Sequence, residues 1–125
     1  MFPFDVGVEG WALFTTKAER QKRKFSQLLV ESICESVPFA EWILNFIEMT
    51  TPIRRDEIAE NPELFAKELE KLLGEGARIV NREIVENLYD KLGIELDEID
   101  DQDLPRYIRY ASSIYLKRAE KGETR

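Results

Sequence analysis

The sequence contains no histidine and one cysteine among its 125 residues. Histidine is the commonest general base, metal ligand and pH-responsive side chain, so its absence removes the usual members of a catalytic set. Cys34 has no second cysteine to pair with, so no intramolecular disulfide can form, and a reducing compartment fits. A Cys–His nucleophile is also excluded, and we predict that Cys34 is a buried, inert thiol.

Long apolar runs are missing as well. No stretch approaches the roughly 18 apolar residues that a membrane-spanning helix needs. Apolar clusters occur near the start, but Asp5 and Glu9 interrupt them and no basic segment precedes them, unlike a signal peptide. We therefore predict a soluble cytoplasmic protein.

The residues that are present describe a globular chain. Apolar residues make up 43% and charged residues 34%, and this length suits one domain with a core of its own. The net charge is 18 − 25 = −7, which argues against a nucleic-acid binder because such binding depends on neutralising phosphates. Nothing in the sequence forms a catalytic set, so we predict a protein that is not an enzyme and that carries no metal or other cofactor.

Helical periodicity dominates the chain after residue 16. We expect helices over about 17–36, 37–50, 62–73, 77–92 and 104–121, with a short helical turn at 56–59. Ser36 is placed to cap the second helix, which carries five apolar residues on one side: Phe39, Trp42, Ile43, Phe46 and Ile47. The predicted fold is an all-α bundle of about five helices forming a single domain over 17–121, followed by a disordered tail at 122–125.

The stretch "LLGEGAR" at 72–78 contains two glycines. A phosphate-binding loop would need a third glycine and a preceding strand, and an acidic residue at its centre would repel phosphate. Asn61 and Pro62 start the helix before it, and Gly74 is placed to close that helix with a left-handed conformation. We predict that Gly76 then lets the chain reverse, so that the two helices form a central antiparallel hairpin.

Residues 1–16, "MFPFDVGVEGWALFTT", combine aromatic side chains with few charges. We predict an extended apolar arm that packs either on its own domain or on a second chain, since so apolar a segment needs a contact surface. The interface candidates are Phe2, Phe4, Trp11 and Phe14.

A basic run follows the arm. Its five cations and Glu19 give a local balance of 5 − 1 = +4, and they are Lys17, Arg20, Lys22, Arg23 and Lys24. This patch could contact nucleic acid, or it could be the exposed start of a helix. Base stacking requires exposed aromatic residues among the cations, and Phe25 occupies a core position instead.

An acidic run covers residues 95–103. Its members are Glu95, Asp97, Glu98, Asp100, Asp101 and Asp103. A calcium-binding EF-hand counted from Asp97 would need glycine where Gln102 stands and a ligand where Ile99 stands. We therefore predict a solvated loop and no metal site.

The block "IRRDEIAENPELFAKELEKLLGEGARIVNREIVENLYDKLGI" at 53–94 resembles the Nitrosopumilus output domain, a family of small archaeal domains. With the helix before it, the resemblance covers roughly 30–94. It implies an archaeal, all-helical module found alone or at the end of presumed signalling proteins, and it implies no particular activity or site residue.

These observations favour a non-enzymatic protein-interaction or regulatory module of the signalling-output kind, forming a homodimer through the N-terminal arm. Two alternatives stay open. One is a nucleic-acid-associated regulator that uses the basic run at 17–24, and the other is a small-molecule sensor with a pocket between helices.

Overall fold

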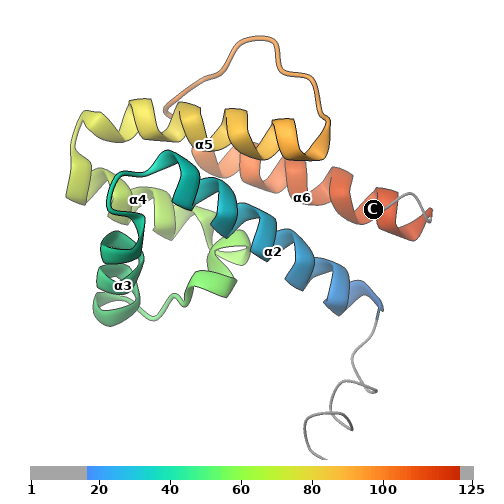
Figure 1. Cartoon of the computed structure of the whole chain (residues 1–125), viewed down its shortest axis with the longest axis horizontal. Coiled ribbons are helices and arrows are strands. Elements are labelled where there is room, and N and C mark those ends of the chain that lie inside the picture. The colour runs from blue at the N-terminus through green and yellow to red at the C-terminus, as the bar shows by residue number, and fades with distance from the viewer. Residues whose placement is uncertain (1–16, 122–125) are drawn as a thin grey trace, which may run out of the picture.

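A computed structural model describes residues 17–121, and all regular secondary structure in this range is helical (Figure 1). The elements are α2 (Lys17–Ser36), α3 (Ala40–Thr50), the 3-10 helix η1 (Arg55–Glu60), α4 (Pro62–Leu73), α5 (Gly76–Leu92) and α6 (Leu104–Glu120). The predicted all-α fold, its five main helices and the short helical turn are confirmed. The predicted arm at 1–16 and the predicted tail at 122–125 lie outside the described residues.

The helices α4 and α5 form the predicted antiparallel hairpin, and α6 lies beside both (Figure 1). The loop 93–103 runs back along α5, so that α6 starts near the beginning of α5 and ends near its end. Two contacts fix this arrangement: Arg78 pairs with Asp101 at the start of α5, and the Arg118 guanidinium donates to the Leu92 carbonyl at its end. Among residues 17–121, none of the helices is long and apolar enough to cross a membrane.

The helix α2 supplies the centre of the core, because it packs on α5, α6 and η1. Its residues Phe25, Leu29 and Ile33 recur at intervals of four and are at most 1% exposed. The large side chains buried with them come from every other helical element: Leu44, Ile47, Ile58, Phe65, Leu69, Ile84, Leu88, Leu104 and Ile108. Burial of each such side chain contributes about 1.5–3 kcal/mol, so the fold is held by one shared core.

The connection between α2 and α3 differs from the prediction. Ser36 does not cap α3 but ends α2, where its hydroxyl donates to the Ser32 carbonyl (2.7 Å) and accepts from the Asn87 amide (2.7 Å). The helix α3 starts at Ala40 instead, directly after Phe39 in the left-handed region (φ 58°, ψ 40°). The Ser36 hydroxyl is engaged by α5, which explains why it is not free to cap α3.

The glycines behave partly as predicted. Gly74 closes α4 with a positive φ of 59°, but its ψ of −131° is not that of a left-handed helix. Gly76 is the first residue of α5 and not the reversal point, so that prediction was wrong. Gly93 closes α5 in the left-handed conformation, which glycine adopts without steric cost. At the start of α4, Asn61 occupies the N-cap position, yet its amide donates to the Glu57 carbonyl and forms no side-chain cap.

Candidate functional site

The outer side of α3 is an exposed apolar surface. We call it the α3 face; it comprises Phe39 (84% exposed), Trp42 (61%), Phe46 (36%) and Met49 (84%). These residues recur at intervals of three and four and therefore share one side of the helix. Ile43 and Ile47 of the same helix are buried. The apolar residues predicted to share one side are thus divided between the core and the surface.

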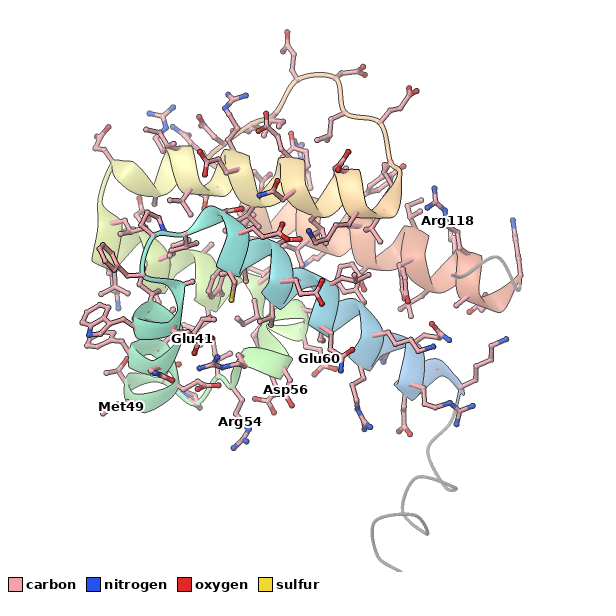
Figure 2. The ribbon with its side chains drawn as sticks, viewed as in Figure 1. Glu41, Met49, Arg54, Asp56, Glu60 and Arg118 are labelled. Atoms are coloured by element: carbon pink, nitrogen blue, oxygen red, sulfur yellow. The ribbon has the colours of Figure 1, made fainter. Side chains whose placement is uncertain are left out.

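Polar contacts on a neighbouring side of α3, about 100° around the helix from the α3 face, help to fix its orientation. The guanidinium of Arg55, at the start of η1, donates to Glu41 (3.1 Å), Asn45 (2.8 Å) and Glu48 (3.2 Å). The backbone N–H of Arg55 also donates to Glu48 (2.8 Å). Figure 2 shows Glu41 on the side of α3 that faces η1 and Met49 at the outer end of the helix. The helix α3 is thus attached to η1 through its polar side and to the core through Ile43, Leu44 and Ile47, which leaves its aromatic side facing outward.

These contacts also affect ionisation. The hydrogen bonds from Arg55 hold the pKa of Glu48 below its ordinary value of 4.5, because they stabilise the carboxylate form. The hydrogen bonds of Arg55 with Glu48 and Glu41 also raise the pKa of Arg55, because they stabilise the charged guanidinium. Arg55 and Glu48 therefore both stay charged at neutral pH. The contacts of Arg55 with Glu41, Asn45 and Glu48, which we call the clasp between α3 and η1, are intact there.

A groove of about 670 Å³ adjoins the α3 face. Its walls come from the α2–α3 turn, α3, the end of α4 and the start of α5, and its lining is Pro38, Phe39, Trp42, Ile43, Leu72, Leu73, Gly76 and Val80. All of these residues are apolar or glycine, so the groove offers van der Waals contact and no charge. The rings of Trp42 and Phe46 stack at its edge with centroids 5.5 Å apart.

The residue at the corner of the groove has an unusual backbone. Phe39 is the one non-glycine residue in 17–121 with a positive φ. For a bulky L-residue the left-handed region costs about 1–2 kcal/mol. This conformation places a largely exposed aromatic ring at the junction of α2 and α3, where it lines the groove.

The basic run occupies the first two turns of α2. Lys17, Lys22 and Lys24 are exposed, while Phe25 is buried as predicted. The run is not purely cationic on the surface, because a shallow cleft between α2 and η1 brings carboxylates to it. That cleft is lined by Glu19, Lys22, Arg23, Ser26, Asp56 and Glu60. Carboxylates beside these cations repel phosphate, so this region is expected to bind phosphate weakly.

The acidic run forms the loop over α5, and its carboxylates are dispersed. Asp101 pairs with Arg78 (3.3 Å) and Arg82 (3.7 Å), and its carbonyl accepts from Asn81 (3.0 Å). Within residues 17–121 no group of three or more potential ligand side chains is placed to hold a metal ion. The described part of this loop therefore acts as a cover for α5 that is tethered by ion pairs.

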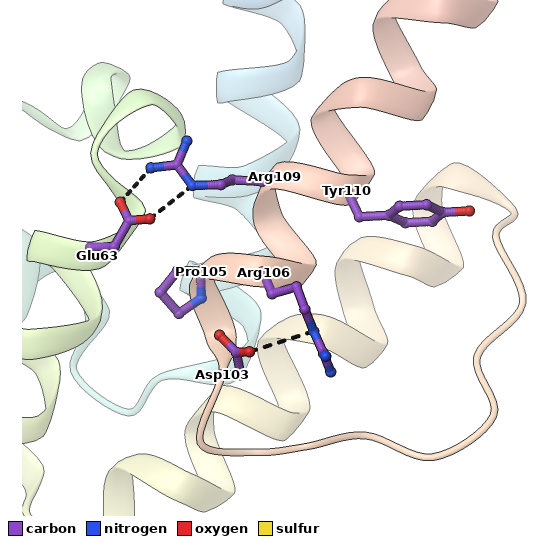
Figure 3. Close-up of a pocket in the computed structure, with 6 residues that line it drawn as sticks. All are labelled: Glu63, Asp103, Pro105, Arg106, Arg109 and Tyr110. Atoms are coloured by element: carbon purple, nitrogen blue, oxygen red, sulfur yellow. Dashed lines mark hydrogen bonds and ion pairs between the residues drawn. The ribbon is translucent and has the colours of Figure 1, made fainter.

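A pocket of about 530 Å³, with four charged residues in its lining, lies where α4 meets the start of α6 (Figure 3). Its charged side chains already pair with one another: Arg109 donates to Glu63 (2.8 Å), and Arg106 lies 3.5 Å from Asp103. Figure 3 shows Tyr110 directed away from both pairs. A charged ligand would have to displace these ion pairs, so this pocket is a weaker candidate than the apolar groove.

Cys34 is exposed, so the prediction of a buried thiol was wrong. It follows the core residue Ile33 on α2 and lies just off the buried side of that helix. Partial desolvation, with a further contribution from the Glu41 carboxylate, raises the pKa of the thiol. The thiolate is therefore scarce at neutral pH, and the side chain is a poor nucleophile despite its exposure.

The interface candidates predicted from the sequence, Phe2, Phe4, Trp11 and Phe14, lie outside the described residues. The aromatic content of α3 is evident in the sequence, but its exposure is not. One signal was available: aromatic and isoleucine side chains alternate around α3 over an arc wider than one buried stripe.

Comparison of the chain with protein-family models, with curated proteins and with solved structures found no match. The resemblance to the Nitrosopumilus output domain therefore stays a prediction.

Proposed function

We propose that the protein is a non-enzymatic interaction or regulatory module of the cytoplasm, of the output kind that the family resemblance implies. In this proposal it self-associates as a homodimer, with the α3 face and the N-terminal arm as its contact surfaces. The exposed α3 face is the observation that carries the proposal.

Two properties of the α3 face support a role in protein contact. Aromatic residues and methionine are enriched in the cores of protein interfaces, whereas single exposed apolar residues are ordinary on any surface. Phe39, Trp42, Phe46 and Met49 are contiguous along one helix, whereas Ile79 on α5 and Tyr110 on α6 are exposed on different helices. The stacked rings of Trp42 and Phe46 also form a rigid surface that loses little side-chain entropy on binding.

Light scattering across a concentration series tests the proposal. We expect a dimer for the natural chain and a monomer for the double variant Trp42→Ser, Phe46→Ser. The variant Ile79→Ser is the matched control, because it removes an apolar side chain that is 65% exposed on another helix. A natural chain that stays monomeric at all concentrations contradicts self-association, and a dimer that survives the double change contradicts the α3 face as its interface.

The groove favours a second candidate, a sensor for an apolar small molecule. Its volume of about 670 Å³ falls within the range of roughly 300–1,000 Å³ typical of ligand pockets. Saturable one-to-one binding of an apolar fluorescent dye, lost in a Val80→Asp variant, supports this candidate. Binding that is weak and unsaturable counts against it.

A further inference from the structure

The groove beside α3 is apolar, and the chain contains a segment of matching chemistry. We propose that Phe2-Pro3-Phe4 of a second copy inserts into this groove, with the reciprocal insertion completing a two-fold dimer. This inference rests on the proposed function and specifies which surfaces meet.

The chemistry of the two sides matches. The groove is lined by apolar side chains from three helices and the α2–α3 turn, and its rim carries the stacked rings of Trp42 and Phe46. The segment 2–4 presents two aromatic rings on either side of a proline and carries no charge. Proline restricts the unbound segment and therefore lowers the entropy lost when it is held in a groove.

The length of chain before α2 decides which part of the arm can reach. The groove lies at the α3 end of α2, opposite the end at which Lys17 begins the helix (Figure 1). A helix of 20 residues is about 30 Å long at 1.5 Å per residue. Phe4 precedes Lys17 by 13 residues, which extend to about 43–47 Å, whereas Trp11 precedes it by six, which extend to about 20 Å. Phe2 and Phe4 therefore have the reach, while Trp11 does not reach the groove of its own chain.

Insertion into a second copy offers the arm more surface to pack on than a path along its own α2 does. To reach its own groove, the arm would have to follow the whole of α2, a path of about 30 Å. The exposed residues along α2 include Lys24, Gln27 and Glu31, which offer an apolar arm little to bury against. Between two copies the arm is not confined to α2, and Trp11 and Phe14 gain a second chain to pack on. A reciprocal exchange also closes the assembly with both grooves filled.

Fluorescence of the full chain tests the insertion. The chain has two tryptophans, so a Trp11→Phe background leaves Trp42, on the rim of the groove, as the single reporter. In this background we expect the double change Phe2→Ser, Phe4→Ser to shift the emission of Trp42 to the red and to weaken dimerisation at least about tenfold. The control Val6→Ser, Val8→Ser removes apolar side chains from the same arm and should change the Trp42 emission little. Circular dichroism melting of each variant confirms that the fold is retained.

The outcomes separate the inference from the proposed function. A dimer whose Trp42 emission does not respond to the changes at Phe2 and Phe4 overturns the insertion and leaves self-association standing. A chain that is monomeric throughout, with Trp42 covered by the segment, overturns exchange between copies and self-association together, and places the segment on its own chain. A red shift accompanied by a fall in mass supports the proposal.

Discussion

The indole of Trp42 stacks on the ring of Phe46 with centroids 5.5 Å apart and planes 13° from parallel, and neither ring is buried. The pair faces outward because Arg55 fastens a neighbouring side of α3 to η1 while Ile43 and Ile47 face the core. The position of the aromatic surface therefore depends in part on a polar clasp on a neighbouring side of the helix. This dependence can be tested without altering the surface itself.

The first prediction concerns the clasp. Arg55→Ala removes hydrogen bonds to Glu41, Asn45 and Glu48, and its side chain is 29% exposed. Hydrogen bonds to charged groups contribute about 1.5–3 kcal/mol, so we expect the free energy of unfolding to fall by about 1–3 kcal/mol. Urea denaturation followed by circular dichroism measures this change.

Arg54→Ala is the matched control for the clasp. Its side chain is 77% exposed and lies 4.0 Å from Asp56, so we expect a change within about 0.5 kcal/mol. Equal effects of the two substitutions would show that the clasp has no special role in holding α3.

The second prediction concerns pH. The pKa of Glu48 is lowered by its hydrogen bonds from Arg55, relative to an ordinary value of 4.5 in the unfolded chain. The stability gained from this carboxylate is therefore fully present above about pH 4.5 and is lost as the pH falls through the lower, folded-state pKa. We expect Glu48→Gln to destabilise more at neutral pH than at an acidic pH well below the unfolded-state value of 4.5. Urea denaturation at both pH values measures the difference.

Glu63→Gln is the comparison for the pH effect. Arg109 lowers the pKa of Glu63 as well, but both side chains are more than half exposed, so solvent screens the pair. We expect a smaller pH-dependent loss than for Glu48. A Glu48 variant whose destabilisation is the same at both pH values would contradict a contribution from ionisation.

Most of the fold could be predicted from the sequence because local signals agree with the tertiary structure. Val80, Ile84 and Leu88 recur with helical periodicity, and all three are buried. Gly93 ends α5 in the left-handed conformation, as a glycine placed just after a periodic segment predicts. In these segments the side of the helix that is apolar in the sequence is the side that is buried in the structure.

The candidate site was harder to predict because it depends on contacts between distant residues. Ser36 has the chemistry of an N-cap, but Asn87, far along the chain, engages its hydroxyl. Trp42 and Ile43 are both apolar neighbours, and the orientation of α3, set by its tertiary contacts, decides that one faces solvent and the other the core. Composition and periodicity carry no information about that orientation.

The third prediction separates the two glycines of the α4–α5 turn. Gly74 has φ 59° and ψ −131°, a combination that side chains rarely adopt, whereas Gly76 is helical. A Cβ at either position would meet no atom within 4 Å, so backbone conformation alone decides the outcome. We expect Gly74→Ala to destabilise by about 1–3 kcal/mol and Gly76→Ala to stabilise by up to about 1 kcal/mol. Thermal melting of the two variants measures this, and a Gly74→Ala variant as stable as the natural chain would contradict the strained turn.

The last prediction is that Phe39→Gly raises stability and weakens dimerisation. Glycine accepts the left-handed backbone at no steric cost, and Phe39 is 84% exposed, so little burial is lost on its removal. We expect Phe39→Gly to raise the free energy of unfolding by about 0.5–1 kcal/mol, because the cost of the left-handed conformation disappears. The same change removes a wall of the groove and should weaken dimerisation.

Phe39→Ala distinguishes the two effects, because it removes the ring but keeps the Cβ that makes this conformation unfavourable. We expect it to weaken dimerisation as Phe39→Gly does, without the gain in stability. Denaturation and light scattering on the same samples measure both properties. If Phe39→Gly destabilised the chain and left its mass unchanged, the ring would have to be retained for packing within the domain, and its strained exposure would no longer indicate a contact surface.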